Sequence, residues 1–203
     1  MTPFAQVSGA AAPLMEANVN TDVIVRIERL SEFASDALEP YAFEAWRFQD
    51  DGTENADFVL NQSPWRGAPI LLAGQNFGCG SSREGAVHAL GCVGIRAVIA
   101  PSFGGIFRNN CYQNGMLPVV LPEDVVAGFA EIARLQPDAP FEIDLERQVV
   151  VPPNGAPVPF EIDGLRKQAL LAGVDDLGLT AERLPEIADW QDRDRAARPW
   201  VWL

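Results

Sequence analysis

The sequence is poor in histidine and cysteine. It has one histidine, His88, and three cysteines, Cys79, Cys92 and Cys111, and no two cysteines have the C-x-x-C spacing. This set cannot supply a four-ligand zinc or iron–sulfur site of ordinary spacing, and an odd number of cysteines argues against a disulfide scaffold. We therefore expect no metal site within this chain.

Basic residues and long apolar runs are also scarce. The chain has 15 basic against 28 acidic residues, a net charge of −13, and no Lys/Arg-rich run offsets it. A nucleic-acid partner and an anionic membrane surface are therefore disfavoured. The N-terminus lacks the basic start of a signal peptide, and no run approaches the roughly 20 apolar residues of a membrane span. We expect a cytoplasmic protein.

The middle of the chain alternates between strand and helix patterns. With 203 residues, 48% of them hydrophobic, the chain is long enough to bury a large core as one domain, 1–203. PILLAG (69–74), a helix from Ser81 to about Leu90, and RAVIAP (96–101) form a predicted β-α-β unit. A helical turn over 105–112, the strand LPVVLP (117–122) and the amphipathic helix EDVVAGFAEIARL continue an α/β pattern.

The C-terminal part and one long loop depart from this alternation. Two alternating apolar segments around a Pro/Gly-rich turn predict a β-hairpin from Phe141, and a helical extension follows over about 164–203. The segment 31–67 mixes aromatic residues with acids and turn formers, and it is either a functional loop or a surface loop held down by its aromatics. The tryptophans of the terminal RPWVWL could anchor a partner or fold back onto the domain.

One stretch, QNFGCGSSREGAVHAL (75–90), carries the pattern of a small-anion site. Gly78 and Gly80 allow backbone conformations closed to other residues at the point where a strand turns into a helix. The helix N-terminus offers free N–H groups, and Arg83 offers a planar fork that matches a carboxylate or phosphate. The dinucleotide fingerprint, the P-loop and the G-x-S-x-G elbow all fail on spacing.

Two plainer interpretations compete with an anion site. Ser81 and Glu84 also fit the capping box S-x-x-E, in which the serine merely caps a helix. Cys79 could be a nucleophile, but His88 lies about two helical turns away, too far for a local pair. Arg83 in the first helical turn conflicts with the helix dipole unless an anion arrives, which favours a site. With a dicarboxylate bound there, Ser81 could take a proton from the adjacent carbon.

Longer motifs resemble a known family. ILLAGQNFGCGSSREGAVHAL and GIRAVIAPSFGGIFRNNCYQNGMLPVVL resemble the swivel domain of the aconitase superfamily. ANVNTD, WRFQDDGTENADFVLN and FEIDGLRKQALLAGVDDLGLT resemble, more narrowly, the small subunits of 3-isopropylmalate dehydratases. The resemblance covers nearly the whole chain in order. It implies a β/β/α fold with a barrel-like mixed sheet flanked by helices.

The resemblance also implies a reaction and a partner. Such enzymes convert 2-isopropylmalate to 3-isopropylmalate in leucine biosynthesis by removing and readding water. A [4Fe–4S] cluster on a separate large subunit activates the hydroxyl, and the small subunit contributes a serine base and contacts to the substrate carboxylates. No cofactor is then expected in this chain.

Individual roles follow by resemblance. The family's catalytic serine falls on Ser81 and its carboxylate-binding arginine on Arg83. The aspartate of its TD motif falls on Asp22, although Asn20-Thr21-Asp22 is also good turn chemistry.

Further family positions fall on Ser82, Glu84, Asn109 and Asn110, which we expect to shape the loop and line the cleft. Of these, Ser82 and Asn110 are candidate substrate contacts. His88 is expected to be a packing or surface residue.

Four positions depart from the usual family pattern. Asn20, Arg26, Gly85 and Gly105 stand where Asp, Pro, His and Asp are usual. The stretch VIVRIERLSEF, in which family members select the substrate's side chain, carries Arg26 and Arg29 as further candidate substrate contacts. A related hydro-lyase for another alkyl-substituted malate, and an anion-binding module without catalysis, therefore remain alternatives.

Overall fold

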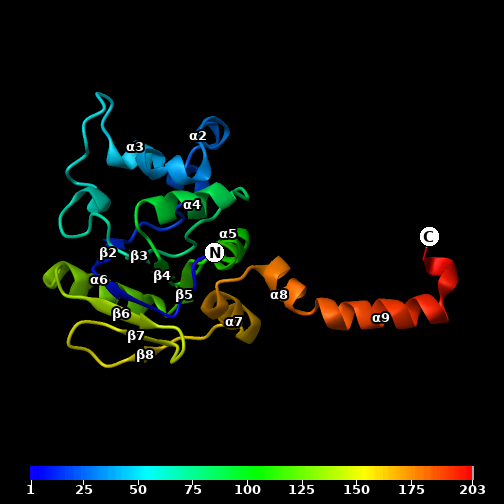
Figure 1. Ribbon diagram of the computed structural model, residues 1–203. Coiled ribbons are helices and arrows are strands. Elements are labelled where there is room, and N and C mark those ends of the chain that lie inside the picture. The colour runs from blue at the N-terminus through cyan, green and yellow to red at the C-terminus, as the bar shows by residue number, and fades with distance from the viewer. Residues whose placement is uncertain (203) are drawn as a thin grey trace.

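The computed structural model describes residues 1–202, which form two four-stranded sheets and surrounding helices (Figure 1). The parallel sheet has the order β2-β3-β4-β5. Its strands are β2 (Ala11–Leu14), β3 (Ile70–Ala73), β4 (Ala97–Ala100) and β5 (Leu117–Val120). Nearly every residue in these strands is buried, as expected for a parallel sheet covered on both faces.

The second sheet is antiparallel and has the order β1-β6-β7-β8. Its strands are β1 (Gln6–Gly9), β6 (Phe141–Asp144), β7 (Val149–Val151) and β8 (Val158–Pro159). β7 and β8 pair on either side of the Pro/Gly-rich turn, so the predicted hairpin is confirmed, and β6 and β1 extend it. The α/β class with both strand directions is confirmed, and the two directions occupy separate sheets.

Two hydrophobic cores lie on opposite faces of the parallel sheet. Ile70 and Leu72 of β3 point to a core that includes Phe129 of α6 (Glu123–Leu135) and Phe141 of β6. Leu71 and Ala73 point the other way, to a core that includes α4 (Glu84–Cys92) and part of the segment 31–67. The alternation along one strand therefore joins both halves of the molecule.

The long loop predicted over 31–67 is a series of short helices. They are α2 (Ile27–Glu32), η1 (Ser35–Ala37), η2 (Glu39–Tyr41), α3 (Glu44–Arg47) and η3 (Val59–Asn61). Phe43 stacks on Trp46 with ring centroids 5.9 Å apart, and Phe58 packs on Phe43 at 5.6 Å. The buried Arg47 donates from Nη1 to the Glu39 carbonyl oxygen at 2.7 Å. Aromatic packing and this hydrogen bond hold the segment on the body.

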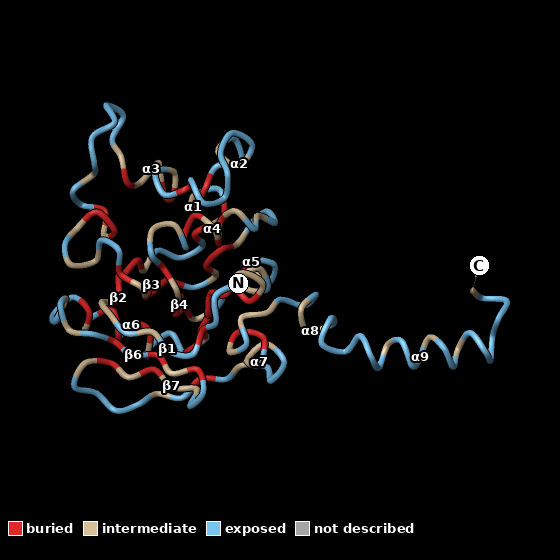
Figure 2. Tube along the Cα trace, viewed as in Figure 1, coloured by how far each residue is buried: buried red, intermediate tan, exposed pale blue. Residues whose placement is uncertain are grey.

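The C-terminal helices leave the body. α7 (Gly164–Ala172) packs through the buried Leu170, whereas α8 (Asp176–Glu182) and α9 (Leu184–Ala197) contain no buried residue. η4 (Pro199–Val201) ends the described chain. Figures 1 and 2 show α8 and α9 extending away from the sheets as an exposed arm. None of the helices in residues 1–202 is both long and apolar enough to cross a membrane.

Candidate active site

The glycine-rich stretch lies where three parallel strands end. The chain segments after β2, β3 and β4 run beside one another at the carboxyl edge of the sheet, the place where open α/β sheets bind ligands. Gly78 donates its N–H to the Val19 carbonyl oxygen at 2.7 Å, and Phe77 donates to the Ser102 carbonyl oxygen at 3.1 Å. We call residues 75–83 the corner.

Two glycines let the corner pack tightly. Gly78 has φ +68°, and a Cβ there would clash with the ring of Phe107 in α5 (Gly105–Gln113). Gly80 has φ +90°, a conformation that side chains rarely adopt. The corner therefore bends sharply and keeps its next residues, Ser81 and Ser82, exposed at the surface.

The helix after the corner begins later than the sequence indicates. α4 starts at Glu84, its N-cap residue is Arg83, and no side chain caps it. The predicted start at Ser81 and the alternative role of Ser81 as a helix cap are therefore wrong. The physical reason is that Thr21 Oγ1 donates to the Ser81 carbonyl oxygen at 2.8 Å, so this carbonyl does not accept a helical hydrogen bond.

Thr21 is a site residue that the sequence reasoning missed. It is 1% exposed, and its own N–H donates to the Cys79 carbonyl oxygen at 2.9 Å. Thr21 is the first residue of α1 (Thr21–Ile24), whose N-cap Asn20 accepts from the Val23 N–H at 2.9 Å. The sequence Asn20-Thr21-Asp22 indicates a turn at this position. It does not indicate that Thr21 contacts Ser81, because the two residues are 60 positions apart.

Arg83 and Asp22 form an ion pair through Nη1 of Arg83 and Oδ1 of Asp22. The side chain of Arg83 is 11% exposed and that of Asp22 is 53% exposed. The contact is close but not aligned as a hydrogen bond. Among residues 1–202, neither Nη1 nor Nε of Arg83 has a hydrogen-bond partner, although both atoms are buried. The two predicted residues are thus brought together, with part of the guanidinium's donor capacity unused.

The two arginines of the α2 region have different surroundings. Arg29 is held by Glu44, with Nη2 to Oε1 at 2.6 Å and Nε to Oε2 at 3.1 Å. The hydrogen bond to Glu44 raises the pKa of Arg29 above its ordinary value. The side chain of Arg26 is 61% exposed, and its Nε lies 3.9 Å from Oε2 of Glu28. Of the two, Arg26 is the one open to an incoming ligand.

The remaining predicted polar residues lie around α5. Asn110 is half-buried on this helix. Asn109 Oδ1 accepts from Arg166 Nη2 at 2.9 Å, and Glu84 Oε1 accepts from Asn114 Nδ2 at 2.9 Å. Glu84 and Asn109 therefore tie α5 to its neighbours, as expected for residues that shape the site.

The cysteines do not form a metal centre. Within the described residues, no group of three or more His, Cys, Asp or Glu side chains could hold a metal ion. Cys111 is fully buried, and burial raises the pKa of its thiol, so it is a poor metal ligand. Cys79 Sγ lies 3.4 Å from the Asn18 carbonyl oxygen, and Cys92 Sγ lies 3.3 Å from that of Ser35. These residues do not fit an iron–sulfur cluster.

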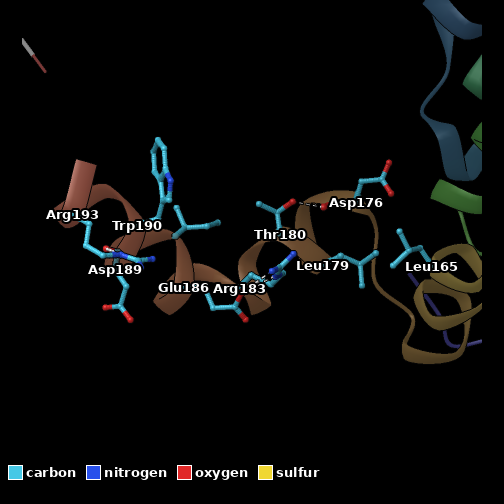
Figure 3. Close-up of a pocket in the computed structure, with 10 residues that line it drawn as sticks. Leu165, Asp176, Leu179, Thr180, Arg183, Glu186, Asp189, Trp190 and Arg193 are labelled. Carbon is cyan, nitrogen blue, oxygen red and sulfur yellow. Dashed lines mark hydrogen bonds and ion pairs between the residues drawn. The ribbon is translucent and has the colours of Figure 1, made fainter. Parts of the chain in front are cut away.

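A large hollow of the surface lies elsewhere. It has a volume of about 830 Å³ along α8 and α9, and Figure 3 shows the side chains that line it. His88 lines a separate hollow of about 590 Å³ with residues such as Met1 and Arg96. None of the residues in the corner lines either hollow. We place the candidate site at the corner because two exposed serines and Arg83 follow one another there, whereas volume alone specifies no chemistry.

Comparisons with known proteins identify the family of this chain. A family model described as "Aconitase C-terminal domain" matches residues 1–124, and one described as "LeuD_N" matches 129–164. The 3-isopropylmalate dehydratase small subunit of Rhodospirillum centenum is 46% identical over 201 residues, 99% of either chain. That of Gluconacetobacter diazotrophicus is 46% identical over 200 residues, 98% of this chain and 97% of the relative. The chain belongs to the family of 3-isopropylmalate dehydratase small subunits.

A solved structure supports the family's fold. The 3-isopropylmalate dehydratase of Methanocaldococcus jannaschii superposes with a TM-score of 0.66 at 28% identity. The match covers 91% of this chain and 99% of that one. The aconitase-type swivel fold expected from the sequence is therefore confirmed for this dehydratase small subunit.

Of the four departures from the family pattern, Gly85 has a visible consequence for packing. A Cβ on Gly85 would clash with the Leu30 side chain of α2, so Leu30 fills the space beside this helix start. A Cβ on Gly105 would meet nothing within 4 Å. The dehydratase small subunit therefore uses Gly85 to seat α2 on α4, whereas nothing in the structure explains Gly105.

Proposed function

We propose that this chain is the small subunit of a 3-isopropylmalate dehydratase, a hydro-lyase that interconverts 2- and 3-isopropylmalate by removing and readding water. Relatives with this name match nearly the full chain at 46% identity, and the corner supports the role chemically. The observation that carries the proposal is the placement of an exposed Ser81, two residues before the Arg83 that pairs with Asp22, at the carboxyl edge of the parallel sheet.

Arg83 binds a substrate carboxylate in this proposal. A buried donor without an acceptor costs about 1–3 kcal/mol; Nε of Arg83 is such a donor, whereas Nη1 is paired with Asp22. A carboxylate oxygen entering the corner would supply acceptors and a second negative charge beside Asp22. Asp22 is half-exposed, so it can turn toward solvent or toward the substrate while Arg83 stays in place.

Ser81 accepts a proton from the carbon next to the bound carboxylate when water is eliminated, and it returns the proton when water is added. Thr21 holds the backbone of Ser81 by donating to its carbonyl oxygen, and the Ser81 hydroxyl is not used to cap α4. Arg83, two residues along the chain, favours the alkoxide electrostatically. Asp22 partly offsets the positive charge of Arg83 and contacts the substrate near its hydroxyl group.

Other residues surround the substrate at the rim. Ser82 and Asn110 offer polar contacts, and the exposed Arg26 attracts the dianion toward the corner. Arg29 is bound to Glu44, so we assign it to holding α2 against α3 instead of contacting the substrate. The substrate's alkyl group then lies against the α2 segment.

The site is completed by a large subunit in a heterodimer. A [4Fe–4S] cluster on that subunit would supply the Lewis acid for the departing hydroxyl. The cysteines of this chain do not fit such a cluster, so its own residues bind, orient and move the proton. The exposed serines of the corner would then face the large subunit.

Reconstitution tests this function. The purified chain is mixed anaerobically with an iron-loaded large subunit, and the unsaturated intermediate is followed by its ultraviolet absorbance. Turnover of 2-isopropylmalate by the mixture, and by neither chain alone, is expected. A panel of alkylmalates in the same assay separates this substrate from a related one, and inactivity with every malate would favour an anion-binding module.

A further inference from the structure

The C-terminal arm, residues 174–202, exposes apolar side chains that have no place in the body. Its helices α8 and α9 contain no buried residue, and Figure 2 shows them in the exposed colour along most of their length. Its large exposed apolar residues are Leu177, Leu184, Trp190, Trp200 and Val201. Trp190 is 53% exposed and Trp200 is 74% exposed. Exposed aromatic groups on a projecting element are typical of interaction sites.

Several charged side chains of the arm pair with one another. Arg183 pairs with Glu186 at 2.6 Å, three residues further along the chain. Asp194 accepts from Arg198 at 2.6 Å and from Trp202 Nε1 at 2.8 Å. These local pairs support the helix, but a 14-residue helix without tertiary packing is marginal in water. The exposed apolar side chains are what remains to be covered.

A hollow of about 830 Å³ lies along the arm, and of these exposed apolar residues Trp190 lines it. Figure 3 shows that it extends from Leu165 on α7 past Leu179 on α8 to Trp190 on α9. Ile187 adds a fourth apolar wall. Asp189 stands at the hollow with its carboxylate unpaired among residues 1–202. The hollow thus fits an apolar side chain with a basic neighbour.

Charge distinguishes the possible occupants. The arm carries seven acidic and four basic residues, and the whole chain has a net charge of −13. A second copy would therefore bring like charge against like charge, which disfavours association. The relatives that match 99% of this chain, the arm included, are named small subunits, so the arm belongs to the part shared with them. A large subunit is the partner such a shared arm would serve.

We propose that the arm is a docking element for the dehydratase large subunit, which inserts an apolar side chain into the hollow and places a basic residue opposite Asp189. The inference rests on the proposed function, because it takes the large subunit as partner. The arm then anchors the complex at a distance from the corner, and the corner remains free to meet the substrate. Trp190 is the central residue of this contact.

Calorimetric titration of the full chain with the large subunit that reconstitutes turnover tests the inference. Trp190→Asp is compared with Ala188→Asp, which adds the same charge to the exposed side of α9 outside the hollow. Trp190→Asp should weaken the dissociation constant by ~30-fold or more, as loss of an interface hot spot does. Ala188→Asp should change it by about twofold at most. Turnover at saturating subunit concentrations should be unchanged in both variants.

Three results would overturn the inference. Equal affinity of Trp190→Asp and wild type, with an active wild-type complex, would reject the arm contact and leave the proposed function intact. A wild-type chain that neither binds the large subunit nor supports turnover would reject both. Dimerisation of the chain alone in sedimentation velocity, abolished by Trp190→Asp, would assign the hollow to a second copy.

Discussion

Single residues at the corner differ in how much freedom they have. Arg83 is nearly buried, its neighbour Asp22 is half-exposed, and Ser81 is exposed but held by its carbonyl. A nearly buried guanidinium beside a half-exposed carboxylate suits a site in which a substrate carboxylate takes the place of Asp22 as the partner of Arg83. Single substitutions can therefore remove one feature at a time, such as the planar group of Arg83 or the hydroxyl of Thr21.

Replacing Arg83 by lysine keeps the charge and removes the planar fork. We expect Arg83→Lys to raise the Michaelis constant of the reconstituted enzyme by about 10-fold, because an ammonium cannot reproduce a two-point contact with a carboxylate. Steady-state kinetics on isopropylmalate measure this effect. The exposed Arg26→Lys is the control and should change little. Unchanged constants for Arg83→Lys would assign the Asp22 pair to structure alone.

Replacing Thr21 by valine removes the hydroxyl that fixes Ser81 and keeps the shape. We expect the turnover number of Thr21→Val to fall about 10-fold, the Michaelis constant to stay within about twofold, and stability to fall by about 1 kcal/mol. Thr21→Ser should restore turnover, since it restores the donor. A fall in stability without any change in turnover would limit Thr21 to a structural role.

At this scale the sequence indicates contacts between near neighbours. Ser81 and Arg83 lie in one short stretch, whereas Asp22 was placed in the site by the family resemblance and lies beside Arg83 in the structure. The sequence does not indicate the partner of Arg29, because Glu44 lies 15 residues away, or that of Thr21, whose partner Ser81 is 60 residues away. Neither partner can be read from local spacing.

At the scale of elements, the packing of α2 on α4 depends on the absence of a side chain at Gly85. A Cβ on Gly85 would clash with Leu30, whereas a Cβ on Gly91 of the same helix meets nothing. Glycine to alanine in a helix normally stabilises by about 0.5–1 kcal/mol. We expect Gly91→Ala to give this gain and Gly85→Ala to give none in the wild-type background.

The clash is tested by removing its other partner. In a Leu30→Ala background, Gly85→Ala should recover a gain of about 0.5–1 kcal/mol, so that the double-mutant cycle has a non-zero coupling. The free energy of unfolding in denaturant measures each variant. If the effects of Gly85→Ala and Leu30→Ala on the free energy of unfolding are additive, the packing of α2 on α4 does not depend on this glycine.

Elements with strong local signals were predicted well. The apolar runs of β3, β4 and β5 and the amphipathic α6 appear within a residue or two of their expected bounds. The start of α4 was misplaced by three residues because a capping signal is local and the contact that overrides it is not. The helical extension expected over about 164–203 consists of α7, α8, α9 and η4, and no local pattern indicated that α8 and α9 would leave the body.

At the scale of the whole molecule, the chain has an exposed corner at the sheet edge and an exposed arm that projects from the body (Figure 1). A net charge of −13 repels a dianionic substrate, so the arginines near the corner must offset it locally. In the proposed arrangement, this chain contributes proton transfer and anion binding to a site that it shares with a large subunit.

The most direct test of this account is the turnover of the reconstituted complex with Ser81→Ala beside Ser82→Ala. Both serines are exposed and neither caps α4, so both variants should fold and bind the large subunit as the wild type does. The account predicts that Ser81→Ala lowers the turnover number by about 10²- to 10⁴-fold, the contribution of a general base, and that Ser82→Ala lowers it only a few-fold. Turnover by Ser81→Ala within a few-fold of the wild type would contradict it.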